Sequence, residues 1–137
     1  MDRTVYLTLG GKEYPMRFSL GASMKISEKY GSLGKMSDAL TDMDEKKALD
    51  TIADIVELLI NQGCAYKNLF EKDMPVPENA PVVEGKYVGL TKEDLYLAIE
   101  FSDIPELRTK IMQTIVGGTK PKILTQEKDK EKNAETT

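Results

Sequence analysis

Apolar and polar residues alternate over residues 4–18 and predict a β-hairpin. Gly10 and Gly11 separate the two alternating runs and match the residue preference of a two-residue hairpin turn. Pro15 cannot donate a backbone hydrogen bond, so we expect the second arm to be an edge strand. The apolar positions are Val5, Leu7, Leu9, Tyr14, Met16 and Phe18. Because a lone hairpin is marginal in water, this apolar face is expected to cover another element.

A helical period replaces the alternation over residues 19–72. Ser19 is expected to cap a helix over residues 20–30, and Gly31 is expected to end it. A shorter helix is expected over residues 34–40, where apolar residues recur at helical spacing.

The strongest pattern is a long amphipathic helix that continues to Gln62. Asp42 or Asp44 is expected to cap this helix, and Gly63 is expected to end it. Its apolar residues fill a continuous arc of about 160°, so we expect this helix to be the centre of the core. Another helical stretch is expected over residues 64–72.

Three prolines within seven residues predict an irregular surface loop over residues 73–87, because proline cannot donate to a strand ladder. These prolines are Pro75, Pro77 and Pro81. The loop is expected to connect the first helical part to a second one.

The second helical part is expected over residues 91–116. Thr91 and Asp94 form a box-like capping arrangement at its start. The helix that follows, to about Phe101, is apolar on nearly all sides, which predicts either deep burial or association with a partner. A last helix is expected to end at the Gly117–Gly118 pair.

Together these elements predict an α+β fold, mostly helical, with an N-terminal β-hairpin packed on about five helices. We expect a single domain over residues 1–118, because 137 residues is an ordinary length for one domain. Residues 119–137 are rich in Lys and Glu and have little apolar surface to bury, so a disordered, flexible charged tail is expected there.

The composition argues against catalysis. The chain has no histidine, which removes the commonest general acid–base group near neutral pH and the commonest imidazole metal ligand. Its one cysteine, Cys64, fits a reducing compartment and has no evident activating base. The Gly10-Gly11-Lys12 sequence lacks the glycine spacing and the Lys-Ser or Lys-Thr of a P-loop, and the acids between residues 38 and 45 lack the spacing of a calcium loop. We therefore expect no enzyme activity, no cofactor and no metal.

The charge distribution narrows the class of partner. The first 118 residues hold 14 of the basic and 19 of the acidic side chains, and such an acidic body is a poor match for a phosphate backbone. No apolar run approaches the roughly 20 residues of a membrane span, and the N-terminus lacks a secretory signal. We expect a cytoplasmic protein that binds neither nucleic acid nor membrane.

Apolar residues outside the expected core are the remaining candidates for function. Leu58 falls on the otherwise polar face of the long helix, either as a singly exposed leucine, which is the favoured interpretation, or as an anchor for a partner protein. The all-round apolar helix supplies the other candidate partner-binding residues: Leu95, Tyr96, Leu97 and Phe101.

Methionine is common in this chain, with seven residues. Those at apolar-periodic positions are Met16, Met24, Met36, Met43 and Met112. Core filling is the favoured interpretation, and an adaptable binding surface is the alternative.

A longer pattern covers the N-terminal third. A hydrophobic strand is followed by Gly10-Gly11-Lys12-Glu13-Tyr14, a second hydrophobic strand, and a helix that ends in Tyr30-Gly31. The long acid-capped helix follows, and a second helical part starts with Leu90-Thr91-Lys92-Glu93-Asp94. In this order and spacing the chain resembles tail assembly chaperones of siphophages and related prophages, best over residues 4–63 and more loosely over residues 90–117.

The resemblance implies a non-catalytic protein of the host cytoplasm that binds the tape measure protein and recruits tail tube subunits during tail morphogenesis. Such a protein is not expected in the mature virion. Self-association and a longer frameshifted form stay open. The alternative function is a structural head–tail connector or tail completion protein of a phage or prophage.

Overall fold

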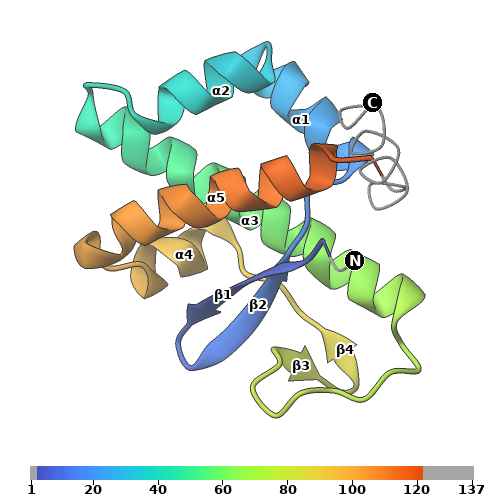
Figure 1. Cartoon of the computed structure of the whole chain (residues 1–137). Coiled ribbons are helices and arrows are strands. Elements are labelled where there is room, and N and C mark those ends of the chain that lie inside the picture. The colour runs from blue at the N-terminus through green and yellow to red at the C-terminus, as the bar shows by residue number, and fades with distance from the viewer. Residues whose placement is uncertain (1–2, 122–137) are drawn as a thin grey trace, which may run out of the picture.

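The structure is a computed structural model that describes residues 3–121. It is α+β and mostly helical, as predicted (Figure 1). Its elements are β1 (Val5–Leu9), β2 (Lys12–Met16), α1 (Leu20–Tyr30), α2 (Leu33–Leu40), α3 (Glu45–Phe70), β3 (Val82–Val83), β4 (Lys86–Tyr87), α4 (Lys92–Ala98), the 3-10 helix η1 (Phe101–Asp103) and α5 (Ile104–Thr119). None of the helices in this part of the chain is long and apolar enough to span a membrane. The predicted charged tail lies outside the described residues, apart from its first three positions.

The N-terminal hairpin forms as predicted. β1 and β2 pair antiparallel with Leu7 opposite Tyr14. Gly10 and Gly11 make the turn with φ values of 58° and 80°, which glycine adopts without steric cost. Met16 is completely inaccessible to solvent, so the hairpin covers the core with one face.

The outer edge of β2 faces α3 and the chain that follows it. Glu13 donates its backbone N–H to the carbonyl of Asn79 at 2.9 Å, and Arg17 donates to the carbonyl of Leu59 at 3.1 Å. Alternate residues of a strand direct their backbone groups to the same edge. Pro15 therefore lies on this outer edge, where its missing N–H removes no hydrogen bond to β1. The predicted edge strand is confirmed.

Three helices, α1, α3 and α4, begin at the predicted caps. Ser19 caps α1 by accepting a hydrogen bond from a backbone N–H three residues later, at 3.1 Å. Of the two acids considered, Asp44 caps α3, while Asp42 accepts a hydrogen bond from the backbone of Asp44. Thr91 and Asp94 form the reciprocal capping box of α4. These hydrogen bonds satisfy backbone donors that a helix start leaves free.

The predicted end of the long helix at Gly63 is wrong. α3 runs without interruption from Glu45 to Phe70 and absorbs the stretch predicted as a separate helix. A Cβ atom at Gly63 would lie 2.9 Å from the amide nitrogen of Met16 and closer still to the carbonyl of Pro15. Gly63 is therefore where the backbones of α3 and β2 meet, and not a helix stop.

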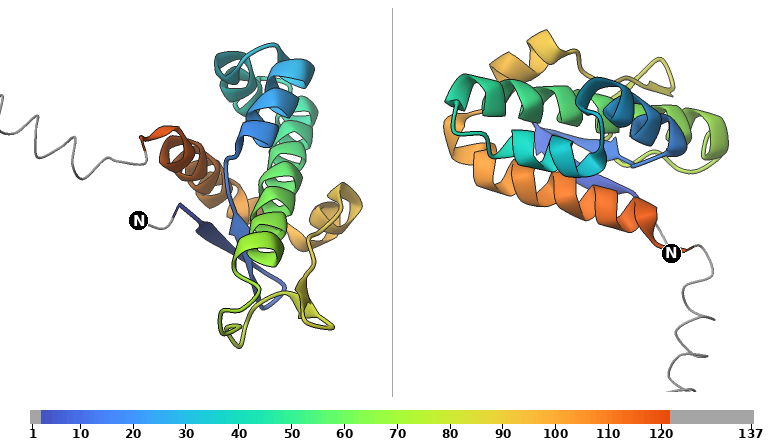
Figure 2. Two further views of the ribbon diagram at one scale, coloured as in Figure 1. Left: turned by 90° about the vertical axis from the view of Figure 1, so that its right-hand side faces the viewer. Right: turned by 90° about the horizontal axis from the view of Figure 1, so that it is seen from above.

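α3 is the centre of the fold, as its wide apolar arc predicts. It packs against α1, α2, α4, α5 and β2, and Figures 1 and 2 show these elements arranged around it. Fully buried side chains of α3, including Ile55 and Leu59, share one hydrophobic cluster with Met16 and Ile111. The starts of α3 and α5 lie at the same end of the molecule as α4 (left in Figure 1).

The proline loop is not irregular throughout. After Pro81 the chain forms a second hairpin, in which β3 pairs with β4 and the turn residues Glu84 and Gly85 have φ values of 52° and 80°. The side chain of Asn68 fastens this hairpin to α3, because it donates to the carbonyl of Tyr87 at 3.0 Å and accepts from its N–H at 2.8 Å. The prolines precede both strands, so they do not interrupt the ladder.

Two helix ends in the second helical part differ from the prediction. α4 ends at Ala98, since the backbone is extended at Ile99, and Phe101 belongs to η1 instead. α5 continues through the glycine pair that was expected to end it. A Cβ atom at Gly118 would lie 2.7 Å from the Cβ of Phe18, so this glycine also marks a close approach.

Candidate functional site

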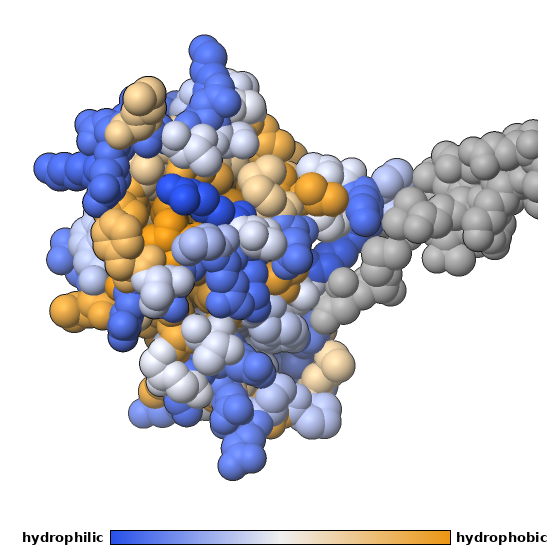
Figure 3. Space-filling view, turned by 60° about the vertical axis from the view of Figure 1, so that its left-hand side comes forward, coloured by the Kyte–Doolittle hydropathy of each residue, from blue (hydrophilic) through white to orange (hydrophobic). Residues whose placement is uncertain are grey.

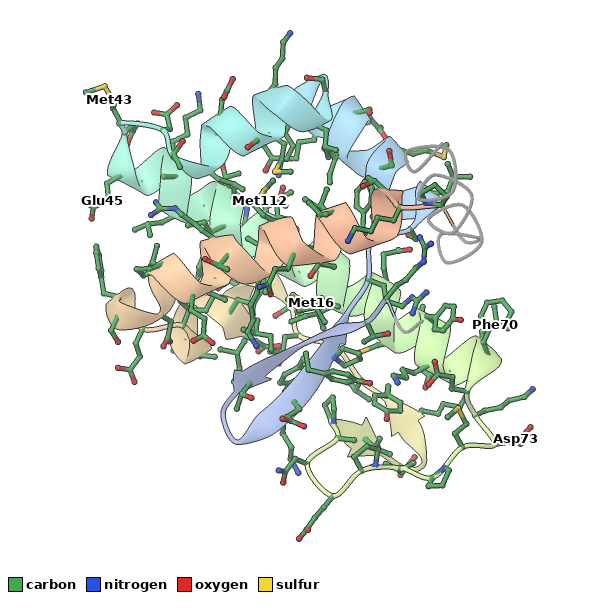
Figure 4. All side chains as sticks on the ribbon, in the orientation of Figure 1. Met16, Met43, Glu45, Phe70, Asp73 and Met112 are labelled. Carbon is green, nitrogen blue, oxygen red and sulfur yellow. The ribbon has the colours of Figure 1, made fainter. Side chains whose placement is uncertain are left out.

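Apolar side chains gather on the surface at the end of the molecule where α3 and α5 begin (Figure 3). Phe101 exposes 70% of its surface, Leu97 exposes 89% and Tyr96 exposes 53%. Met43, in the loop before α3, is fully exposed, and Figure 4 shows that it projects outward at the same end as Glu45. Large apolar side chains clustered in this way are typical of a protein-binding surface.

Three adjoining hollows form a groove at this end, which we call the Leu49–Phe101 groove. The first hollow has a volume of about 150 Å³, and its lining includes Leu49, Ile52, Leu95, Tyr96, Phe101 and Ile104. The second, of about 250 Å³, shares Leu49 and Phe101 with the first and adds Met43 and Arg108. The third, of about 400 Å³, is lined by Glu45, Lys46, Leu49, Asp50 and Tyr96.

The shape of the hollows indicates the kind of ligand. Each of the three hollows is open at the surface, so none encloses most of a bound molecule as a small-molecule pocket does. A row of shallow hollows that all meet at Leu49 instead fits successive side chains on one face of a partner helix.

Four of the five predicted binding residues lie on or near α4. Tyr96 and Phe101 line the groove, and Leu97 is exposed on the same helix as Tyr96 without lining it. Leu95 lies in the groove floor but is completely buried, so it acts as a core residue that shapes the floor. The apolar residues of α4 therefore divide between the core, where Leu95 lies, and the surface, where Tyr96 and Leu97 lie.

Leu58 lies away from the groove. It is half-buried and packs against the core, so the favoured interpretation of a singly exposed leucine is wrong. It lines a separate polar hollow together with Lys25, Lys29 and Asp54. Its role as a partner anchor stays a prediction.

A polar network holds α4 against α3 and fixes the ring of Tyr96. The Tyr96 hydroxyl donates to Asp50 at 2.8 Å, and the Lys92 ammonium lies 2.7 Å from the same carboxylate. The backbone N–H of Lys92 donates to Glu57 at 2.6 Å. The hydrogen bonds from Lys92 and Tyr96 hold the pKa of Asp50 below its ordinary value, so the carboxylate is charged at neutral pH.

The sequence analysis did not single out Leu49 and Asp50, which line the groove, or Lys92, which pairs with Asp50 beside it. In the sequence Leu49 is one member of the apolar arc of the long helix, and Asp50 and Lys92 are two charges among many. The ion pair between Asp50 and Lys92 joins residues 42 positions apart. No local sequence pattern predicts it, because it depends on how α4 packs on α3.

Two of the acids considered for a metal site have structural roles at the start of α3. Asp44 caps α3, and Asp42 accepts from the backbone N–H of Asp44 at 2.8 Å. Within residues 3–121 no group of three or more Cys, Asp or Glu side chains is placed to hold a metal ion. These observations leave the apolar groove as the candidate site.

The methionines divide between the core and the surface. Met16 and Met36 are completely buried, which confirms core filling at these two positions. Met24 and Met43 are exposed and Met112 is partly exposed, so core filling is wrong for them. A flexible thioether such as Met43 beside the groove can adapt to different side chains of a partner.

Cys64 should be almost unreactive in the folded protein. Burial raises the pKa of its thiol to about 11, so the reactive thiolate is about 100-fold scarcer at pH 8 than in an unfolded chain. We expect its reaction with a disulfide reagent at pH 8 to be at least about 100-fold slower in buffer than in concentrated guanidinium chloride. Equal rates in the two solvents would contradict the burial of Cys64.

Comparisons of the chain with protein-family models, with curated proteins and with solved structures found no match.

Proposed function

We propose that this chain is a non-catalytic tail assembly chaperone of a phage or prophage, active in the host cytoplasm, which binds an apolar helix of the tape measure protein in the Leu49–Phe101 groove. The observation that carries the proposal is the exposure of Phe101 and Tyr96 over a row of shallow hollows. Covering such aromatic rings removes apolar surface from water, and residues of this kind often dominate binding energy. The resemblance of residues 4–63 to tail assembly chaperones supports the choice of partner.

The proposed mechanism is mass action on exposed apolar helices. A chaperone that binds the unassembled tape measure protein lowers the concentration of its free apolar segments, and so slows their aggregation. Because the hollows are open and contain the exposed Met43, they suit several related segments better than a single one.

A second apolar surface supports the recruitment of tail tube subunits. Leu69 and Phe70 are exposed in the last turn of α3, Met74 is exposed just after it, and Figure 4 shows Phe70 at the opposite end of the molecule from Met43. A helix of 26 residues is about 39 Å long. Two partners bound at its two ends would therefore not compete for the same surface.

Coexpression tests this proposal. The partner is a helical fragment of the tape measure protein, the very long helix-rich protein that we expect to be encoded downstream of this chain. We expect the fragment to become more soluble and to copurify with the chain. Unchanged solubility and no copurification would contradict the proposal. Recovery of the chain as a fixed component of mature virions would instead favour a head–tail connector or tail completion protein.

Phe101→Ala should reduce copurification of the fragment at least about tenfold, because a central aromatic anchor often contributes more than about 1.4 kcal/mol to binding. The melting temperature should change by less than about 2 °C, since the ring is largely exposed. Leu20→Ala is the matched control, because it truncates an exposed apolar side chain on α1, outside the groove. Equal losses for the two variants would argue against the groove as the binding surface.

A further inference from the structure

The charged side chains around the Leu49–Phe101 groove are mostly acidic. The acids that line its hollows are Asp42, Glu45, Asp50 and Glu100, and the bases are Lys46 and Arg108. Lys47 and Lys92, which pair with Asp42 and Asp50, balance the charges of the lining residues. The excess of acid at this end comes from the first turns of α4 and α5, which add Glu93, Asp94 and Glu106. This excess lies beside an apolar floor, where a charge on a bound partner is screened less than in open water.

Several of these charges already have partners within the chain. Asp42 lies 3.5 Å from Lys47, and Asp50 lies 2.7 Å from Lys92. Arg108 donates its Nε–H to the carbonyl of Leu40 at 3.1 Å, so its guanidinium is held toward α2.

Glu45 and Glu100 are the acids left to meet a bound partner. Both are exposed, and neither has an ion-pair partner among residues 3–121. Glu100 lines the first hollow and Glu45 lines the other two, while Leu49 is common to all three. The two carboxylates therefore lie in different hollows of the groove. Both of these hollows are also lined by the apolar side chains of Leu49 and Phe101.

We propose that the occupant of the Leu49–Phe101 groove is an amphipathic helix whose apolar stripe is flanked by Lys or Arg, with a basic residue placed near Glu45 and another near Glu100. The proposal rests on the proposed function and specifies the chemistry of the partner segment. Apolar contacts supply the attraction, and the two carboxylates select basic flanks and repel acidic ones. A helix with apolar anchors at spacings of three and four residues brings its flanking positions to both sides of the stripe.

Two synthetic peptides of about 18 residues provide the test. They share one leucine stripe at helical spacing and differ only in their flanking positions, which are all Lys or all Glu. Binding to the full chain is measured by fluorescence anisotropy in 50 mM and in 300 mM salt. We expect the Lys peptide to bind at least tenfold more tightly than the Glu peptide at about 50 mM salt, and the ratio to fall at higher salt.

A charge reversal locates the effect. The double variant Glu45→Lys, Glu100→Lys should lose the preference for the Lys peptide or invert it. The double variant Glu13→Lys, Glu28→Lys is the matched control, because both acids are exposed and lie outside the groove. It changes the net charge of the chain by the same amount as the first double variant. This control should keep most of the preference, whereas an equal loss in both variants would assign the effect to overall charge and overturn the proposal.

The remaining outcomes separate this inference from the proposed function. If the two peptides bind equally and Phe101→Ala weakens both, the groove binds helices but the rim does not select charge, and the inference fails alone. If the tape measure fragment binds through Phe101 and neither peptide binds, the stated partner chemistry is wrong. If both peptides bind and Phe101→Ala changes neither affinity, the groove is not the binding surface and the proposed function loses its main support.

Discussion

Replacing Gly63 by alanine should lower the free energy of unfolding by about 3 kcal/mol, because the added methyl group has no space between α3 and β2. Its Cβ would lie 2.9 Å from the amide nitrogen of Met16 and closer still to the carbonyl of Pro15. These are backbone atoms, so no side-chain rotation relieves the overlap, and either the strand or the helix has to shift. Urea denaturation followed by circular dichroism measures the loss.

The sign of this effect is informative, because helix propensity alone predicts the opposite. Alanine is more favourable than glycine in a helix by about 1 kcal/mol. Replacing glycine by alanine should therefore stabilise the protein wherever the added methyl group has space. Gly117 is such a position, since a Cβ there would meet no atom within 4 Å, and Gly117→Ala should be neutral or stabilising. If Gly63→Ala were as stable as the wild type, the close packing of β2 on α3 would be wrong.

Leu95→Ala should lower the free energy of unfolding by about 2–5 kcal/mol, the usual cost of truncating a fully buried leucine. Leu95 is completely inaccessible and is the one residue of α4 that is fully buried. The substitution removes its contacts with the core and leaves a cavity beneath the groove. Thermal and urea unfolding of the variant measure the loss.

Leu97→Ala is the matched control for this prediction. It makes the same chemical change two positions later on the same helix, where the side chain exposes 89% of its surface. Its effect on stability should stay within about 0.5 kcal/mol, because few contacts are lost. A larger loss for Leu97→Ala than for Leu95→Ala would mean that α4 turns the opposite face to the core.

The helix starts and the first turn were predictable because each depends on a few neighbouring residues. Ser19 and Asp44 each accept a hydrogen bond from a backbone N–H within three residues, so a short stretch of sequence contains both partners. The turn at Gly10 and Gly11 needs positive φ values that glycine adopts freely, and the alternating strands on either side identify it.

The role of Gly63 was not predictable in the same way. A glycine after a run of helical residues reads equally well as a helix end or as a site of close packing. The difference depends on the position of β2, whose residues lie more than forty positions earlier in the chain. The same ambiguity explains why α5 continues through Gly118, which lies against Phe18.

The sequence by itself determined the class of fold, the N-terminal hairpin, the helix caps and the set of apolar residues available for burial or binding. The tertiary structure alone decided which of those apolar residues became core and which became surface, and it placed Leu49 beside Phe101. Local hydrogen bonds and turn geometry are encoded within a few residues, so the amino-acid pattern contains them. A groove between residues about fifty positions apart exists only after helices have packed, because its shape depends on their relative placement.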